Sequence, residues 1–161
     1  VDAIHTLLDE ENQSLFEKHG VLSRSELHAR HEIILERYIK EINIEAQASL
    51  QIAKRQILPA VAEFAGSLAQ SVGAIKAVGH TAKAQSKLLG DVCELTDALA
   101  VNIVKLEEAL EKAEEIETAE AFRDIVIPAM SEVRAVADKM ETMVDARYWP
   151  LPTYAEMLFK K

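Results

Sequence analysis

The side chains in this sequence that are best suited to metal binding or catalysis are five histidines. A di-metal carboxylate site in a helical bundle needs Glu-x-x-His motifs on facing helices, and no histidine here has a glutamate three residues before it. His28, His31 and Glu32 share one surface of a predicted helix, but one helix supplies too few ligands to close a metal site. A solvated helix face is therefore the preferred interpretation, metal binding is the minor alternative, and we expect no metal ligands.

Two further patterns could carry chemistry. His80 and Lys83 form a His-x-x-Lys spacing similar to that of histidine phosphotransfer bundles, although His80 follows Gly79 at a predicted helix start and not mid-helix. Cys93 lies one position away from an apolar stripe and is interpreted as a small packing residue. The sequence contains no Gly-rich phosphate loop and no catalytic triad order. We therefore expect no catalytic residue and no cofactor in this chain.

The charge pattern limits the classes of partner. The formal net charge is -9, which argues against a nucleic acid or an anionic membrane surface as partner, because both require a cationic face. A solvated hairpin tip is the preferred interpretation of one acid-rich run, and a docking site for a basic partner is the alternative. The run consists of Glu107, Glu108, Glu111, Glu114, Glu115, Glu117 and Glu120.

Cysteine content and hydropathy bear on location. A single cysteine excludes a disulfide framework within the chain. The sequence shows no long uncharged apolar run and no signal-peptide pattern. These features favour a cytoplasmic protein without a membrane segment. The chain begins at Val1 without an initiator methionine, and we expect it to be a piece of a longer protein.

The elements that would position these residues are predicted to be helices, because alanine, leucine, glutamate and lysine dominate while aromatic residues make up only 5% of the chain. Ser23 and Glu26 form a capping box, which predicts a helix from Arg24. Its apolar positions follow steps of three and four residues as far as about residue 78. They are Leu35, Ile39, Ile42, Ala46, Leu50, Ala53, Ile57, Val61, Phe64, Leu68, Val72 and Ile75.

Two more long helices follow the first. Gly79 ends the first helix, Thr81 is the expected N-cap of the second, which should run to about Ile116, and Thr118 is the expected N-cap of the third. Their stripes are Leu88, Val92, Leu95, Leu99, Ile103, Leu106, Leu110 and Ala113, and then Phe122, Val126, Ala129, Val133, Val136, Met140 and Met143. Short connections permit only antiparallel neighbours.

Two prolines lie inside these predicted helices. Pro59 and Pro128 each remove one backbone hydrogen bond and crowd the carbonyl four residues earlier, so we expect kinks in the first and third long helices. A first helix of this length would be about 80 Å long. One of its ends should therefore project from the bundle or reach another chain. Small residues after Pro59, from Ala65 to Ala74, suggest a surface that another helix can approach closely.

The sequence predicts one all-α domain over residues 1–161, an elongated antiparallel bundle of three long helices with short helices at both ends. Residues 1–22 should form a cover of two short helices, 2–8 and 9–18, ended by Gly20. Residues 23–147 form the bundle. Residues 148–161 form a docked tail, with a last helix over 153–159 capped by Thr153 and Glu156.

Four segments of the sequence resemble, in order, the C-terminal region of type III glutamine synthetases. They are LFEKHGVLS at 15–23 with HARHE at 28–32, YIKEINIEA at 38–46, AKRQILPA at 53–60, and YWPLPTYAEMLF at 148–159. The resemblance implies that the parent enzyme condenses glutamate with ammonia using ATP and divalent magnesium or manganese, held in a catalytic domain that precedes Val1. It places no catalytic residue in this chain.

The resemblance also implies a role for the chain. In this family the helical C-terminal region is associated with the assembly of stacked rings, so we expect a non-catalytic assembly or regulatory domain whose partners are its own catalytic domain and neighbouring subunits. A free-standing phosphorelay or adaptor bundle is the alternative. The residues expected to serve packing or assembly are Ile42, Ile57, Pro59, Phe64, Pro128, Trp149, Pro150, Leu151, Pro152 and Phe159.

Overall fold

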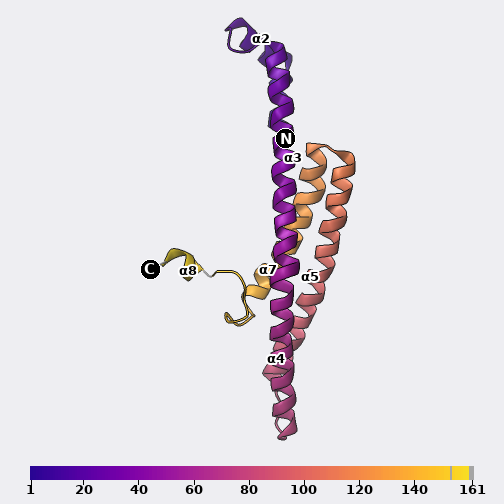
Figure 1. Cartoon of the computed structure of the whole chain (residues 1–161), viewed down its shortest axis with the longest axis vertical. Helices are drawn as coiled ribbons and strands as arrows, with labels where there is room; N and C mark the ends of the chain where they lie inside the picture. Colours follow the sequence, from indigo (N-terminus) through magenta and orange to yellow (C-terminus); the bar gives the residue numbers. More distant parts are fainter. Residues whose placement is uncertain (153, 160–161) are drawn as a thin grey trace. The chain divides into compact units, whose positions relative to one another are not determined.

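The computed structural model of the chain describes residues 1–152 and 154–159. Every regular element in these residues is a helix (Figure 1), so the predicted all-α class is confirmed. The chain forms two compact units, one of Val1–Gln47 with Glu108–Pro128, and one of Ala48–Glu107 with the described part of Ala129–Lys161. None of the helices in the described residues has the length and hydrophobicity that crossing a bilayer requires.

The first unit begins with three short elements, α1 (Asp2–His5), the 3-10 turn η1 (Thr6–Leu8) and α2 (Glu10–Lys18). They match the two short helices predicted for residues 2–18. Gly20 has φ 61°, the left-handed conformation expected of the residue that ends a helix. The amide of Gly20 donates to the Glu17 carbonyl (3.0 Å) and that of Val21 to the Phe16 carbonyl (3.0 Å), which is a Schellman motif.

The longest helical stretch consists of α3 (Arg24–Ile52), the π turn η2 (Ala53–Ile57) and α4 (Leu58–Ala77), with no loop between them. The capping box is confirmed, since the Ser23 amide donates to Glu26 Oε2 at 2.7 Å and the Glu26 amide donates to Ser23 Oγ at 3.3 Å. The stretch ends in a second Schellman motif at Gly79, where φ is 87°.

Each internal proline follows a π turn. The amide of Leu58 donates to the Ala53 carbonyl, five residues earlier, directly before Pro59. The amide of Ile127 donates to the Phe122 carbonyl in the same way, directly before Pro128. A π turn inserts one extra residue into the helix, and this changes the position of the carbonyl that a proline ring would otherwise crowd. Helical structure therefore continues through both prolines.

The remaining helices are α5 (Lys83–Ile116), α6 (Ala119–Ala121), the π turn η3 (Phe122–Val126), α7 (Ile127–Glu141) and α8 (Tyr154–Leu158). Thr118 caps α6 as predicted, since its side chain accepts from the Ala121 amide. The prediction of Thr81 as a cap is wrong, because α5 begins two residues later at Lys83. The predicted cap Thr153 lies outside the described residues.

The predicted stripes supply most of the core, since none of their members is exposed, although some are only half-buried. In the first unit the most buried large side chains are Leu27 and Phe122. In the second unit the core combines Val61 and Phe64 of α4 with Leu99 of α5 and Met140 of α7. In the described part of the chain, no other helix covers the predicted small-residue surface on α4. Gly66 and Gly73 are exposed, and a Cβ at either would meet nothing within 4 Å.

Candidate interaction surfaces

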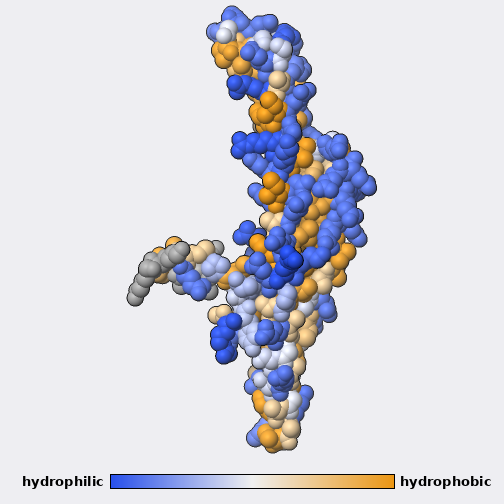
Figure 2. All heavy atoms as spheres, viewed as in Figure 1, coloured by the Kyte–Doolittle hydropathy of each residue, from blue (hydrophilic) through white to orange (hydrophobic). Residues whose placement is uncertain are grey.

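An apolar surface remains exposed on the N-terminal half of α3. Ile33 and Ile34 are 62% and 40% exposed, and they line a shallow hollow together with Leu22, Glu26, Ala29 and Arg30. We call Leu22, Ala29, Ile33 and Ile34 the α3 patch. Figure 2 shows apolar side chains interrupting the charged surface along this helix. Exposed apolar side chains that adjoin one another are candidates for a binding surface.

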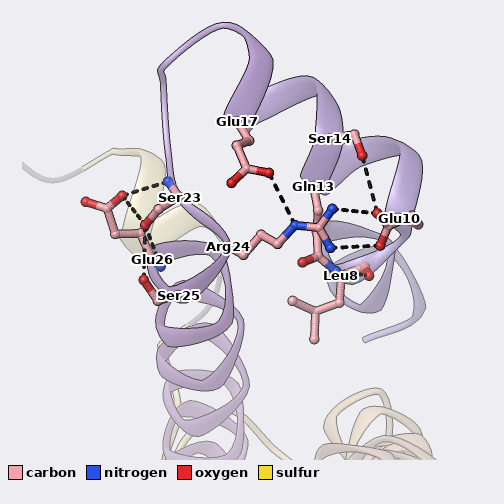
Figure 3. A network of polar contacts seen from close by, with 9 residues as sticks. All are labelled: Leu8, Glu10, Gln13, Ser14, Glu17, Ser23, Arg24, Ser25 and Glu26. Atoms are coloured by element: carbon pink, nitrogen blue, oxygen red, sulfur yellow. Dashed lines mark hydrogen bonds and ion pairs between the residues drawn. The ribbon is translucent and has the colours of Figure 1, made fainter.

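A network of polar contacts sets where α3 starts (Figure 3). The guanidinium of Arg24 donates from Nη1 to Glu10 Oε2 at 2.9 Å and from Nε to Glu17 Oε2 at 3.3 Å, so it ties α2 to the first turn of α3. The hydrogen bond from Arg24 lowers the pKa of the Glu10 carboxyl. The capping box stabilises the same turn, so the helix that carries the α3 patch has a well-defined first residue.

The second unit holds the start of the C-terminal tail. Trp149 is 8% exposed, and the ring of Tyr148 lies 5.5 Å from that of Phe64 between centroids. Leu151 lines an apolar hollow with Ile57 of η2 and Val133 of α7. Among the described residues, the buried indole Nε1 of Trp149 has no hydrogen-bond partner. The tail therefore packs on its own chain as far as Leu151.

The last described residues behave differently. Met157, Leu158 and Phe159 are 55%, 73% and 77% exposed. The sequence predicted that the apolar side chains of the tail would not all remain in water. Among the tail side chains whose burial is described, Trp149 is buried and Tyr148 and Leu151 are half-buried. The three exposed side chains on and after α8 are a second apolar surface without an intramolecular partner among the described residues.

The structure distributes the ten predicted packing and assembly residues over both units. It buries Ile57, Phe64 and Trp149, half-buries Ile42 and Leu151, and exposes Pro59, Pro128, Pro150, Pro152 and Phe159. It does not bring them together into one site. The exposed α3 patch was not predicted as a surface, because Ile33 and Ile34 lie beside the periodic stripe. The sequence did contain a signal for this surface, because Ile33 and Ile34 are apolar but lie outside the three-and-four spacing of the buried stripe.

The structure also shows where the cysteine, His80 and the acid-rich run lie. Cys93 is exposed, so its interpretation as a packing residue is wrong. His80 lies in the connection between α4 and α5, outside any helix. In the acid-rich run, Glu114 accepts from Asn43 Nδ2 at 2.9 Å, and Glu107 pairs with Lys54. Some of these acids therefore serve contacts within a unit.

A histidine pair in the first unit was missed by the sequence analysis. His5 Nδ1 lies 2.9 Å from His31 Nε2, and His5 Nε2 lies 2.7 Å from Glu120 Oε1. These residues come from α1, α3 and α6, so no local spacing could have connected them. No group of three or more histidine, cysteine, aspartate or glutamate side chains in the described residues is arranged to hold a metal ion.

Comparison with known proteins shows which proteins this chain resembles. Residues 1–76 match the model of the glutamine synthetase C-terminal domain family. A type-3 glutamine synthetase from Dictyostelium discoideum is 31% identical over 168 residues, and a glutamine synthetase from Butyrivibrio fibrisolvens is 27% identical over 164 residues.

A glutamine synthetase from Bacteroides fragilis is 24% identical over 170 residues. These alignments cover 98–99% of this chain and 23% of each relative, so the chain spans about a quarter of the length of the curated relatives it matches. Residues 1–76 are therefore similar to the glutamine synthetase C-terminal domain family, and nearly the whole chain is similar to about a quarter of the length of glutamine synthetases.

Proposed function

We propose that this chain is a non-catalytic assembly domain of a type III glutamine synthetase. In this proposal the parent protein condenses glutamate with ammonia in the cytoplasm, with ATP and divalent metal bound outside this chain. The chain contributes surfaces that join its own catalytic domain and neighbouring subunits. The observation that carries the proposal is the α3 patch. Its exposed isoleucines lie on a capped helix in the part of the chain that matches the family, and they are available to contact another protein.

The fold supports this role. We propose that the three long helices form an antiparallel bundle, bent where the π turns precede Pro59 and Pro128. Three features argue for a rigid bundle: the short connection at Gly79, the cap at Thr118 and the buried stripes. A rigid helix presents an apolar face to a partner at lower entropic cost than a loop does.

The test uses the full-length parent protein with the double substitution Ile33→Asp and Ile34→Asp. A charge at the centre of an apolar interface is desolvated without a partner, which strongly weakens association. Light scattering should therefore report a smaller particle than the wild type at the same concentration. The substitutions should lower glutamine formation per subunit only through the loss of assembly, because they lie outside the catalytic domain of the proposed parent protein.

Val78→Asp is the matched control, because Val78 is also exposed but lies at the C-terminal end of α4, outside the α3 patch. Circular dichroism of the 161-residue chain should show that all variants remain folded, since the substituted side chains are at the surface. If the double variant assembles to the wild-type mass, the α3 patch is not an assembly surface and the proposal in this form is wrong.

A further inference from the structure

The outward face of α3 has a further strongly exposed isoleucine besides those of the α3 patch. Ile44 is 67% exposed and Ile33 is 62% exposed, and both lie on one α-helix, Arg24–Ile52. The eleven residues from Ile33 to Ile44 make three turns of 3.6 residues, so both side chains project from the same side of the helix. Leu27 and Ala46, which are buried, lie on the other side. Figure 2 shows charged side chains between the apolar ones along this helix. The exposed face therefore extends from the α3 patch to Ile44.

Four residues on this face are placed symmetrically around Ile33. Leu22 precedes Ile33 by eleven residues and Ile44 follows it by eleven, and both are apolar. Glu26 precedes Ile33 by seven residues and Lys40 follows it by seven, and their exposed side chains have opposite charges. Seven residues are close to two helical turns, so Glu26 and Lys40 share the face of Ile33. Read in either direction from Ile33, the face therefore has a charged position and then an apolar position at the same spacings, with the sign of the charge exchanged.

This arrangement is complementary to itself in an antiparallel pair of helices. In a two-fold contact, residue i of one copy meets residue j of the other copy, and j meets i. With the axis at Ile33, Leu22 of one copy lies level with Ile44 of the other. Glu26 of one copy lies level with Lys40 of the other, where the two charges attract. A parallel pair in register would instead place Glu26 on Glu26 and Lys40 on Lys40, so like charges suppress that orientation.

Glu26 and Lys40 can form such a contact without losing their present hydrogen bonds. Glu26 Oε2 accepts from the Ser23 amide at 2.7 Å, and Lys40 Nζ donates to Glu36. A carboxylate has about four lone-pair sites and an ammonium group has about three donors, so each keeps capacity for a further partner. Glu26 also lines the hollow of the α3 patch. The apolar stem of a lysine can lie over such a hollow while its ammonium group reaches the carboxylate.

We propose that the partner of the α3 patch is a second copy of this chain, which binds through its own α3 in antiparallel orientation around a two-fold axis at Ile33. This inference rests on the proposed assembly function and names the partner of that surface. Ile33 packs on Ile33 at the centre of the contact, and Leu22 packs on Ile44 at both ends. Between these apolar layers, Glu26 pairs with Lys40 on each side of the axis. The charge pairs fix the orientation and the register, and the apolar layers exclude water.

The experiment is thiol cross-linking of the 161-residue chain in a Cys93→Ser background, which removes its only cysteine. A contact between single helices buries less than the roughly 1,600 Å² of a standard interface, so the dimer should be weak and covalent capture is the suitable readout. With a short bis-maleimide, Ile33→Cys should give a cross-linked dimer. Ile44→Cys alone should not, because the two copies of Ile44 lie about 33 Å apart at about 1.5 Å per residue. An equal mixture of Leu22→Cys and Ile44→Cys chains should give the dimer again.

Val78→Cys is the matched control for random collisions, because Val78 is exposed but lies at the C-terminal end of α4, outside the contact. A charge exchange tests the register. Lys40→Glu should lower the cross-linking of Ile33→Cys to the level of Val78→Cys, because it sets a carboxylate against Glu26 of the other copy. Adding Glu26→Lys to the same chain should restore the yield. Circular dichroism should show that each variant is folded, since the substituted side chains lie at the surface.

An Ile33→Cys yield no higher than that of Val78→Cys would overturn this inference, as would self-linking of Ile44→Cys as efficient as that of Ile33→Cys. The light-scattering test of the parent protein separates this result from failure of the proposed function. If the double variant of Ile33 and Ile34 assembles less but Ile33→Cys does not cross-link, the α3 patch binds a different surface and only this inference is wrong. If Ile33→Cys cross-links as expected but the double variant assembles to the wild-type mass, the self-contact is supported and the proposed assembly function is wrong.

Discussion

Removing the indole of Trp149 should destabilise the second unit strongly. Trp149 is 8% exposed, and its backbone is held by a hydrogen bond of 3.1 Å from its amide to the Asp145 carbonyl. Replacing a buried tryptophan by alanine costs about 3–5 kcal/mol. The buried Nε1 has no partner among the described residues, and an unsatisfied buried donor costs about 1–3 kcal/mol in the native state. We therefore expect Trp149→Ala to lower the free energy of unfolding by about 3 kcal/mol, near the lower end of the usual range.

Trp149→Phe separates the two contributions. It keeps most of the aromatic surface and removes the unpartnered N–H, so its cost should stay below about 1 kcal/mol. Phe159→Ala is the surface control, because Phe159 is 77% exposed and its truncation should change stability by less than about 0.5 kcal/mol. For a chain of this size, 3 kcal/mol corresponds to a thermal midpoint lower by about 6–12 °C.

The assay is thermal and urea unfolding followed by circular dichroism at the helix band, because Trp149 is the only tryptophan and its variants lose the fluorescence signal. Two observations would refute the reasoning. The first is a Trp149→Ala midpoint equal to that of the wild type, which would mean that the indole is not part of the core. The second is a Trp149→Phe loss as large as that of alanine, which would mean that the indole N–H has a partner.

Two further predictions concern the turn before Trp149 and the proline in the first long helix. Side-chain and backbone hydrogen bonds from Arg147 lower the pKa of Asp145 to about 2, from an ordinary value of 3.8. The stability from this ionised carboxylate is complete above about pH 4 and is lost as the pH falls through 2, so Trp149 emission should shift to the red over that window. In Asp145→Asn this shift should be absent, and a shift of equal size there would contradict the assignment. Pro59→Ala should fold without loss of stability, because alanine restores a donor to a helix that already continues through this position. A lower urea midpoint would show that the π turn requires the proline.

The sequence alone determined the helices and which of their faces are buried. Apolar residues at steps of three and four all lie on one side of a helix, and no member of the predicted stripes is exposed in the structure. The ends depend on local chemistry as well. The capping box of Ser23 and Glu26, the N-cap Thr118 and the C-terminal Gly20 depend only on residues close to them in sequence, and each forms as predicted. The one cap that failed, Thr81, was misplaced by one residue, because α5 begins at Lys83 and its cap position is Ala82.

Only the tertiary structure decided what depends on contacts between distant segments. The approach of His5 to His31 joins α1 to α3, and no periodicity in either helix contains it. The tail shows the same limit, because composition predicted an apolar segment that packs, and the fold covers Trp149 but leaves Phe159 exposed. A side chain is buried only if another segment packs against it. The sequence pattern of a helix shows which of its faces is apolar, but not which distant segment covers that face.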